Sequence, residues 1–437
     1  MRLSNYTDLC QIAYRDPVIG GDYSYLTGLS LSEIEYKDGF SISSGFLPNS
    51  EPATFSFSIK KHAGIDNAEF TDFMAVADLG YEIRFQTIYY DGFDDDMVPT
   101  AQHWENKGPR FLIKTMDVIP DYLGNLECRI TCEDLMSRAM NVPITMSGYP
   151  ISVTQSAWER FQAIMNHIDA YYDGIFPEFT NGYYNGGFGV DYYNSGYSIW
   201  VPPVTGGAYN AEPAGGILND ILNTDLAWFN FGNGGYEYRA IPFWSPLNPE
   251  IWPLPNDPFI GSVPLNAPLD LEPPGAMRNR VTEITIVNDS DEVIPCLRVE
   301  LASTPATHYS WQDNAAILKY GAKYVKQSIN AYATISTDSG TYNSVEVYGK
   351  SLQSPNNTER VTNMRFSAID RRTDLLQYTT VLNGYSPGQI CPIWYLTDDY
   401  EHAENYIVLS ETHTINQNSW DISVDVWKPT LTNGFAA

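Results

Sequence analysis

The sequence predicts a mainly β protein with α+β parts, in which two small β-barrel-like domains flank an α/β middle region with long irregular loops. Three observations support this fold class. Residues 1–147 read as short alternating segments separated by turns, which is typical of a small barrel or sandwich. Residues 148–275 show helical periodicity between Gly/Asn/Tyr-rich and Pro-rich stretches. Residues 276–437 are an α+β region that returns to alternation, so we expect a second β-barrel closed by a C-terminal hairpin.

Strands in the first region are predicted from alternation with a period of two residues. In "ATFSFSIKK", Phe55, Phe57 and Ile59 alternate with small polar residues and would share one buried face. "YEIRFQTIYYDGF" alternates in the same way and is expected to end in a turn at Asp91-Gly92. Residues 110–135 contain two further strands around a predicted turn at residues 121–125.

Two helices are predicted in the middle region. Ser156 can cap the first, because Glu159 three residues later completes a capping box. Its apolar stripe comprises Ala157, Phe161, Ile164, Met165 and Ile168. The second helix lies in "GGILNDILNTDLAWF" and leads into a hairpin that turns at Asn233-Gly234-Gly235. Its inward-facing residues are expected to be Ile217, Leu218, Ile221 and Leu222.

Two segments of the middle region are predicted to form little regular structure. Residues 175–216 are rich in Gly, Asn and Tyr, and residues 242–275 are rich in Pro. Proline lacks a ladder donor, and glycine carries an entropic cost in a strand or helix. Because long irregular loops are usually functional, we expect their aromatic side chains to dock onto neighbouring subunits.

The last region contains predicted strands in "RVTEITIVND" and "CLRVELAST" and a short helix that Asp313 caps. It ends in a hairpin made of "NYIVLSETHTI" and "SWDISVDVWK". The alternation places Trp420, Ile422, Val424 and Val426 on a core face and Asp421, Ser423, Asp425 and Trp427 on the other. Trp427 therefore needs a cover, for which a neighbouring subunit or a loop is the candidate.

The chain is strongly acidic, with 53 Asp and Glu against 25 Lys and Arg and a net charge of −28. This balance argues against DNA binding through phosphate neutralisation, but it suits a passage through which DNA slides without being retained. The N-terminal residues lack an apolar signal sequence, and no apolar run approaches the roughly 20 residues of a membrane span. We therefore expect synthesis in a cytoplasm and no direct membrane insertion.

Three groups of residues are candidates for metal sites. Cys128 and Cys132 fall on one face of a predicted strand, which favours buried, reduced cysteines over zinc ligands. The acidic stretch Asp91, Asp94, Asp95 and Asp96 lacks the ligand order of a calcium loop, so a solvated turn is the favoured interpretation. The six histidines are His62, His103, His167, His308, His402 and His413, and none lies in a zinc-binding motif. We expect a structural or surface role for His413, and no metal or cofactor.

Motifs for catalysis are equally scarce. The sequence contains no G-x-S-x-G nucleophile elbow, and "VYGKS" lacks the spacing of a phosphate-binding loop. A glycoside hydrolase needs two carboxylates across a groove, and among so many Asp and Glu no pair stands out. No catalytic residue is assigned, and the protein is expected not to be an enzyme.

The order of five strings resembles the tail-hub, or baseplate-hub, proteins of long-tailed bacteriophages. "GFLPNSEPATFSFSIKK" and "RFLIKTMDVIPDYLGNLECRITCEDLMSRAMN" resemble the opening and closing of the first hub barrel, with Asp134 and Leu135 at its end. "GGILNDILNTDLAWFNFGNGGYEYRAIPFW" resembles a helix and hairpin of these proteins, and "DNAAILKYGAKY" a short segment found in them. "ETHTINQNSWDISVDVWKP" resembles their C-terminal strand pair.

The resemblance implies a homotrimer in which each subunit contributes two related barrels to a pseudo-sixfold ring. Such a ring would join the tail tube to the tail tip in the virion and open or close the channel for DNA. It also implies contacts with the distal tail protein, the tape-measure protein and other tail-tip or receptor-binding proteins, with DNA present only in transit. The loops at 175–216 and 242–275 match no part of this pattern.

Two alternatives have different functions. A receptor- or carbohydrate-binding tail protein would stack Tyr192, Tyr193 and Trp200 of the long loop on sugar rings. A tail-associated glycan hydrolase would need a carboxylate pair that the sequence does not single out.

Overall fold

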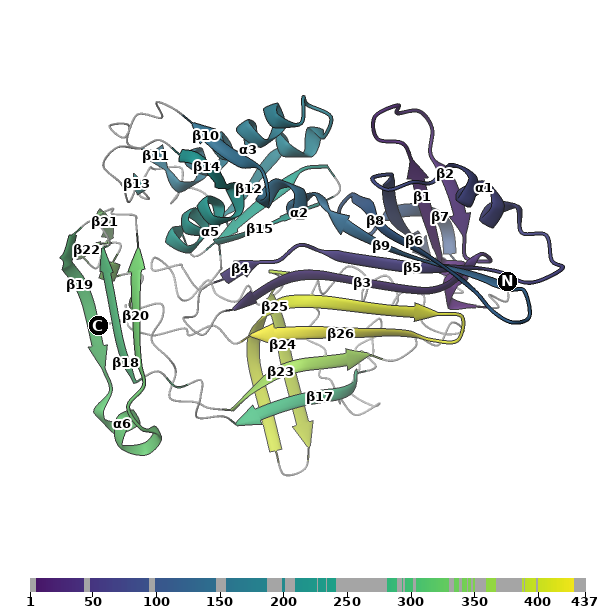
Figure 1. Ribbon diagram of the computed structural model, residues 1–437. Helices are drawn as coiled ribbons and strands as arrows, with labels where there is room; N and C mark the ends of the chain where they lie inside the picture. The colour runs from purple at the N-terminus through teal and green to yellow at the C-terminus, as the bar shows by residue number, and fades with distance from the viewer. Residues whose placement is uncertain are drawn as a thin grey trace.

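The computed structural model confirms a mainly β protein (Figure 1). It describes residues 5–42, 48–93, 99–146, 155–186, 199–200, 209–225, 227–232, 234–240, 281–288, 293, 295–301, 304–329, 334–337, 340–343, 345–346, 349, 359–366, 387–388, 390–397 and 400–427. The predicted domain limits at 147 and 275 both lie outside these ranges and stay predictions. We use the terms N-terminal unit (residues 5–134), middle unit (135–240) and C-terminal unit (281–427) for the described parts. In these parts, no helix is long and apolar enough to cross a membrane.

The N-terminal unit is built almost entirely of strands. Its strands are β1 (Cys10–Arg15), β2 (Ser24–Thr27), β3 (Leu31–Ile42), β4 (Pro48–Ser50), β5 (Thr54–Lys61), β6 (Glu82–Phe93), β7 (Pro99–Asn106), β8 (Phe111–Pro120) and β9 (Leu126–Asp134). Its helices are the 3-10 turn η1 (Tyr6–Leu9) and α1 (Ala68–Val76). The sequence patterns did not predict α1, which Asn67 caps by accepting a hydrogen bond from the Phe70 N–H.

The middle unit carries most of the helix. Its helices are α2 (Leu135–Met140), α3 (Ala157–Tyr171), η2 (Pro177–Phe179) and α5 (Ala214–Asp225). Its strands are β10 (Pro143–Met146), β11 (Gln155–Ser156), β12 (Gly182–Gly186), β13 (Ile199–Trp200), β14 (Tyr209–Pro213), β15 (Ala227–Phe231) and β16 (Tyr236–Ala240). Both predicted helices and the β15–β16 hairpin are confirmed.

The C-terminal unit returns to strands. They are β17 (Val281–Asn288), β18 (Cys296–Leu301), β19 (Thr304–Gln312), β20 (Tyr324–Ile329), β21 (Thr334–Thr337), β22 (Gly340–Asn343), β23 (Glu359–Phe366), β24 (Ile390–Thr397), β25 (Tyr400–Asn416) and β26 (Trp420–Trp427). The helix α6 (Asn314–Tyr320) begins at Asp313, whose carboxylate accepts from the N–H groups of Ala315 and Ala316 as predicted.

One antiparallel sheet runs through both the N-terminal and the C-terminal unit. Its hydrogen-bonded order is β17-β23-β26-β25-β3-β5-β9-β8-β6-β1-β2, with β24, β4 and β7 added at β25, β3 and β6. The two units meet where β3 pairs with β25, from Gly39 opposite Ser410 to Glu33 opposite Asn416. Within the described residues this order is an open path without closure, and it contains strands of both predicted barrels. β18, β19 and β20 form a separate three-stranded sheet, and β21 and β22 a two-stranded one.

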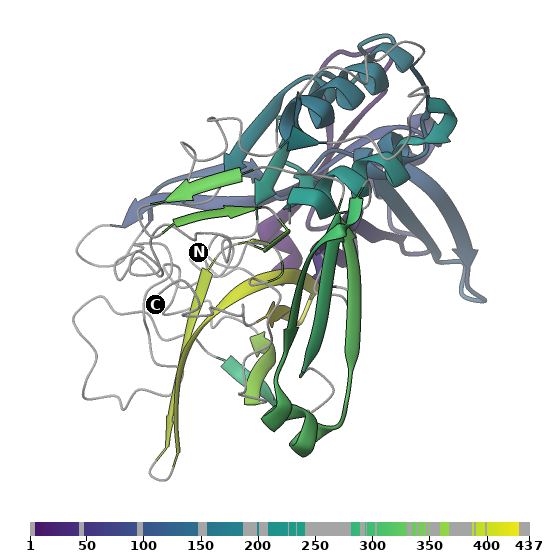
Figure 2. The same cartoon turned by 90° about the vertical axis from the view of Figure 1, so that its left-hand side faces the viewer.

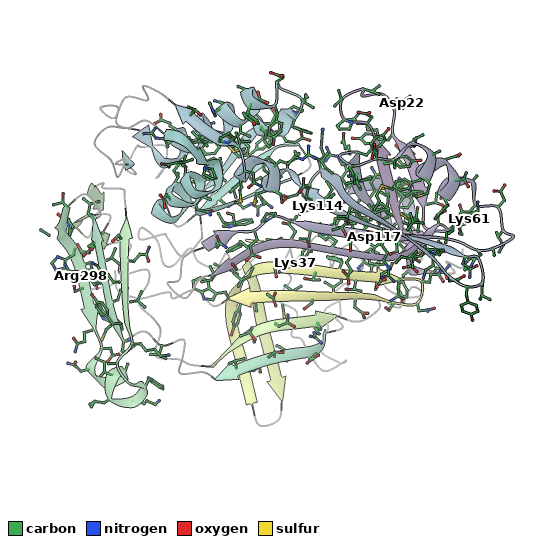
Figure 3. The ribbon with its side chains drawn as sticks, viewed as in Figure 1. Asp22, Lys37, Lys61, Lys114, Asp117 and Arg298 are labelled. Atoms are coloured by element: carbon green, nitrogen blue, oxygen red, sulfur yellow. The ribbon has the colours of Figure 1, made fainter. Side chains whose placement is uncertain are left out.

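The structure contains three apolar cores. The first is shared by the N-terminal and C-terminal units and includes Phe55, Phe57, Trp420 and Val424. The second lies inside the middle unit, between α3, α5, β15 and β16, and reaches Leu112 of β8. The third joins all three units around Phe40, Trp228, Val299 and Trp427. Figure 2 shows from the side how the middle unit lies above the sheet, and Figure 3 shows charged side chains such as Lys37 and Asp117 on the strands of the N-terminal unit.

The closing hairpin forms as predicted, and its core face of Trp420, Ile422, Val424 and Val426 is buried. Trp427 is also buried, at 8% exposure. Its cover belongs to the same chain, in the third core with Phe40, Trp228 and the β18 side chains, so no neighbouring subunit is needed for it.

Two local predictions are wrong. Asp91 and Gly92 do not form a turn; they continue β6, where the register with β7 shifts on both sides of Gly92, because a glycine tolerates such a bulge. The segment 175–216 is also less irregular than predicted. Its residues Gly182–Gly186 form β12, parallel to β16, and the ring of Tyr236 occupies the space that a side chain at Gly182 would need. The segment 242–275 lies outside the described residues.

Gly39→Ala should destabilise the junction between the units. Gly39 has φ +148°, and an added Cβ would lie 2.3 Å from the Leu409 carbonyl oxygen and 2.6 Å from Ser410 Cα on β25. We expect a loss of at least about 3 kcal/mol, measured as the free energy of unfolding in urea, because backbone atoms cannot move aside cheaply.

Gly64→Ala is the matched control for this experiment. Gly64 has φ +75°, but an added Cβ would meet nothing within 4 Å, so only backbone strain of about 1–2 kcal/mol is expected. Equal losses in the two variants would contradict a close approach of β3 and β25.

Candidate functional site

Two clusters of buried charged side chains connect parts of the chain that are distant in sequence. The Arg–Glu cluster consists of Arg15, Tyr23, Glu82, Arg84, Arg110 and Glu178 and joins the N-terminal unit to the middle unit. The Lys–Glu–His cluster consists of Tyr36, Asp38, Lys107, Glu411, His413 and Trp420 and joins the N-terminal unit to the closing hairpin. We treat them as the candidate site because buried charges require specific partners.

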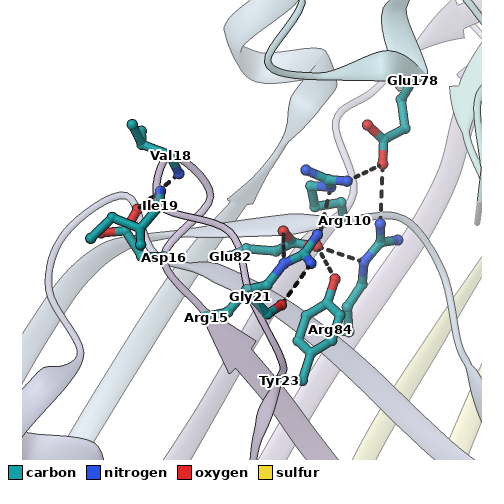
Figure 4. Close-up of polar contacts among 10 residues, drawn as sticks. All are labelled: Arg15, Asp16, Val18, Ile19, Gly21, Tyr23, Glu82, Arg84, Arg110 and Glu178. Carbon is teal, nitrogen blue, oxygen red and sulfur yellow. Dashed lines mark hydrogen bonds and ion pairs between the residues drawn. The ribbon is translucent and has the colours of Figure 1, made fainter.

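Two guanidinium groups and two carboxylates form the centre of the Arg–Glu cluster (Figure 4). Arg84 Nε lies 3.1 Å from Glu82 Oε1, and Arg84 Nη2 lies 3.1 Å from Glu178 Oε1. Arg110 reaches the same two oxygens, with Nε 3.3 Å from Glu82 Oε1 and Nη2 2.9 Å from Glu178 Oε1. All four residues are less than 9% exposed, so these contacts are shielded from water and salt.

Glu82 has the most polar contacts within the Arg–Glu cluster. Arg15 Nε donates to its Oε2 at 2.9 Å, and the Tyr23 hydroxyl donates to its Oε1. Burial by itself would raise the pKa of Glu82, but the Tyr23 hydrogen bond and the three guanidinium groups lower it overall. Burial and the bond to Glu82 raise the pKa of Tyr23, so this phenol stays a donor.

The strand geometry brings these groups together. Glu82 and Arg84 are two residues apart on β6 and therefore lie on the same face, and Arg15 of β1 is the direct cross-strand partner of Glu82. The opposite face of β6 carries Ile83 and Phe85 in the first core. Glu178 comes from η2 of the middle unit, so the polar face of β6 is covered by another unit rather than by water.

The Lys–Glu–His cluster centres on Glu411 of β25. Lys107 Nζ donates to Glu411 Oε1 at 2.6 Å, and His413 Nε2 lies 3.0 Å from Glu411 Oε2. The Trp420 indole Nε1 donates to His413 Nδ1 at 3.1 Å. An indole N–H can only donate, so Nδ1 must accept, and the proton of the neutral imidazole therefore lies on Nε2 and is donated to Glu411.

The electrostatics agree with a neutral histidine beside an ionised Glu411. Burial lowers the pKa of His413, although the carboxylate of Glu411 opposes the shift. Burial would raise the pKa of Glu411, but Lys107 and His413 lower it overall. The result is one full ion pair, Lys107 with Glu411, extended by a neutral hydrogen-bonded ring.

Burial raises the pKa of two more carboxyl groups, that of Asp38 in this cluster and that of Asp134 near it. Burial and the neighbouring Glu411 raise the pKa of Asp38 to about 6, against the opposing charge of Lys107. Burial raises the pKa of Asp134 to about 7, although its carboxylate accepts from the N–H groups of Ala53 and Ser137. Through these two bonds, Asp134 caps α2 and fixes the backbone at the start of β5. Asp134 is also one of the two residues that the resemblance to hub proteins placed at the end of the first barrel.

The arrangement of both clusters favours a structural role, in which they connect the units, over a catalytic role. The central carboxylates Glu82 and Glu411 form ion pairs with cations of their own cluster. Both ring nitrogens of His413 form hydrogen bonds. A general base needs a proton-accepting atom that a substrate can reach, and a nucleophile needs an adjacent base. What the clusters provide is a set of directional, water-shielded contacts between the three units.

Of the candidate metal ligands, Cys128 and Cys132 belong to neither cluster, whereas His413 is a member of the Lys–Glu–His cluster. Cys128 and Cys132 are buried on one face of β9 with Ile130 between them, which confirms the strand interpretation, and burial raises the pKa of both thiols, that of Cys128 to about 11. In the described part of the chain, no group of three or more His, Cys, Asp or Glu is arranged to hold a metal. Asp94, Asp95 and Asp96 lie outside that part.

His413 has the structural role that was expected, and His103 pairs with Glu105 on the exposed strand β7. Tyr192 and Tyr193 lie outside the described residues, and Trp200 belongs to the short strand β13. Carbohydrate binding by these residues stays a prediction.

Sequence reasoning did not identify the members of the two clusters apart from His413. Glu82 and Arg84, like Glu411 and His413, occupy the polar positions of alternating strands, and such positions normally face water. The one available signal was two opposite charges spaced by two residues, and the same spacing occurs in exposed pairs such as Glu127 with Arg129. Burial of that face was decided by the other units.

Lys107→Met should be strongly destabilising, because it leaves the carboxylate of Glu411 buried without its cation. We expect a loss of about 3–5 kcal/mol in the free energy of unfolding. The double variant Lys107→Met/Glu411→Gln should lose less than the sum of the two single variants by about 1 kcal/mol or more, in a urea-denaturation cycle.

The exposed pair Arg365 and Glu283 is the control for that cycle. Its side chains are 62% and 58% exposed at a separation of 3.3 Å, so Arg365→Met/Glu283→Gln should change stability by about 0.5 kcal/mol or less. Strict additivity at Lys107 and Glu411 would show that the two groups do not interact in solution.

Asp38→Asn should change how stability depends on pH. Folding raises the pKa of Asp38 from 3.8 to about 6, so folding favours the protonated form. Its stabilising contribution is complete below about pH 4 and is lost as the pH rises through about 6, a difference of about 3 kcal/mol. Asparagine cannot ionise, so the variant should gain stability relative to the unmodified chain between pH 4 and pH 8.

Urea midpoints at pH 4, 6 and 8 measure this gain, with Asp22→Asn as the control for loss of an exposed carboxylate. A pH-independent difference between the Asp38 variant and the unmodified chain would refute a raised pKa at this position.

No protein-family model matches the chain, and no curated protein matches it in sequence. Solved structures do match. A 43 kDa tail protein of prophage MuSo2 from Shewanella oneidensis is 9% identical, with a TM-score of 0.50 over 97% of this chain and 100% of that one. A tail protein from Neisseria meningitidis MC58 is also 9% identical, with a TM-score of 0.51 over 96% of each chain. The resemblance to phage tail proteins is thereby confirmed at the level of the fold, and this chain has the fold of those two tail proteins.

Proposed function

We propose that the protein is a structural subunit of a phage tail tip, in which three copies form a hub ring. The ring joins the tail tube and the distal tail protein to the tip and surrounds the path of the DNA. One observation carries this proposal, namely that the shared fold extends over 97% of this chain and the whole of a prophage tail protein. A likeness confined to one small barrel would be compatible with many unrelated functions.

The charge of the chain supports the same role. A net charge of −28 on each subunit repels phosphate groups, so a ring of such subunits does not retain DNA that moves through it. Retention of DNA requires Lys and Arg in excess on the contacting surface.

The two buried clusters support a mechanical rather than a catalytic role. A subunit that transmits force between the tube and the tip needs units that keep their relative positions, and buried, mutually paired charges give directional contacts of this kind. The proposal includes contacts with the tape-measure protein inside the ring and with other tail-tip or receptor-binding proteins outside it. It places the protein at the tail tip of the virion after synthesis in the host cytoplasm.

The mass of the purified chain and its place in the virion test this function. Light scattering coupled to size exclusion should give three times the chain mass of 49.1 kDa. Antibodies against the protein should label purified particles at the end of the tail opposite the head, with antibodies against a capsid protein as the control for orientation.

A chain that stays monomeric at all accessible concentrations and is absent from purified virions would rule the proposal out. Hydrolysis of host wall or capsule glycans by the purified chain would instead favour the tail-associated hydrolase.

A further inference from the structure

One end of the N-terminal unit is acidic. Two segments form this end, namely residues 16–29, which include the loop between β1 and β2, and residues 65–80, which include α1. Together they carry six carboxylates and no Lys or Arg. The six are Asp16, Asp22, Asp66, Glu69, Asp72 and Asp78. The two segments are adjacent, because the Thr27 N–H donates to Glu69 Oε2 at 2.9 Å, and the buried rings of Tyr14 of β1 and Phe73 of α1 are in edge contact at 4.9 Å. We call this surface the acidic end.

A surface of opposite sign lies in the C-terminal unit. Residues 314–326, in α6 and the start of β20, carry Lys319, Lys323 and Lys326 and no Asp or Glu. This is unusual in a chain where acidic residues outnumber basic ones by 53 to 25. Lys319 and Lys326 are exposed to solvent, although Lys326 Nζ also lies 2.6 Å from Glu300 Oε1. We call this surface the basic end.

Both ends also expose large apolar side chains. Val18 and Ile19 in the loop between β1 and β2 are 76% and 83% exposed, and Leu29 and Leu79 of the same two segments are also exposed. On the basic end, Leu318 is 89% exposed and Tyr324 is 62% exposed. Apolar side chains grouped on charged surfaces are typical of protein–protein contacts.

The two ends lie on opposite sides of the molecule. In Figure 1 the β1–β2 hairpin and α1 are at the right, whereas α6 is at the lower left, and Figure 2 places α6 toward the viewer with the N-terminal strands behind it. Asp22 and Arg298 mark the same two sides in Figure 3. The ends of one chain therefore do not meet each other, and each is available to another molecule.

We propose that the basic end of one copy of this chain docks on the acidic end of the next, and that this head-to-tail contact builds the ring. A second copy is the occupant because it carries the complementary charge and a matching apolar patch. Elsewhere on their surfaces, two such acidic copies would repel each other. Contacts between two different patches are heterologous, and such contacts form a ring when the rotation closes. This inference rests on the proposed trimer and names the surfaces that hold it together.

Each component of the contact has a distinct physical role. The lysines approach carboxylates such as Asp72 and Asp78, which steers the two copies and sets their register. Leu318 and Tyr324 lose water against the apolar side chains of the hairpin and of α1, which supplies most of the affinity. Because the charges lie at the surface, added salt weakens the steering between copies.

Charge reversal tests the pairing of the ends. The basic-end variant Lys319→Glu/Lys326→Glu and the acidic-end variant Asp72→Lys/Asp78→Lys should each weaken self-association at least tenfold, measured by light scattering and analytical ultracentrifugation of the full chain. A chain that carries all four changes should associate again, because its reversed ends are complementary. Melting temperatures within a few degrees of the unmodified chain establish that each variant is folded.

The matched control is Lys37→Glu/Lys114→Glu, which makes the same change of charge at exposed positions outside both ends. It should leave the trimer intact. A trimer that both end variants leave unchanged would overturn the head-to-tail contact while the proposed function stands. A four-change chain that stays dissociated although folded would also overturn it. An unmodified chain that never associates would refute the proposed trimer itself, and the contact with it.

Discussion

The pairing of β3 with β25 is the constraint on which the rest of the structure depends. Seven cross-strand pairs, from Gly39 with Ser410 to Glu33 with Asn416, join residues more than 370 positions apart into one sheet. The register of β25 shifts next to Leu409, and the Leu409 carbonyl approaches Gly39 so closely that no other residue fits there. Because side chains alternate along strands, this register decides which residues of the closing hairpin join the shared core.

One of the two buried clusters follows from that junction. Once β3 and β25 are paired, Tyr36 lies opposite His413, and Lys107 and Glu411 are enclosed between the two units. The middle unit covers β6 in the same way and places Glu178 against Arg84 and Arg110. Contacts of this kind contribute modestly to net stability but penalise every other arrangement, since a displaced unit leaves a charge buried without a partner. The proposed hub ring would require such rigidity between the units of each subunit.

The distribution of charge on the surface also limits which contacts the chain can form. The chain as a whole is acidic enough to keep DNA from adhering, and such a chain also repels its own copies. Association between copies therefore requires a local exception, and α6 with the start of β20 provides one. In the proposed ring, one composition would serve two needs, because a general negative charge would face the passage and a local positive charge would face the neighbouring subunit.

The sequence by itself determined the local elements. Alternation located β5, β9 and the β25–β26 hairpin, helical periodicity located α3 and α5, and Asp313 marked the start of α6, because these signals depend on neighbours in the chain. The tertiary structure alone decided that both β units share one sheet, that Trp427 is covered by its own chain, and that Glu82, Glu178 and Glu411 are buried. A polar position on a strand looks the same whether water or another unit covers it, and only long-range packing distinguishes the two.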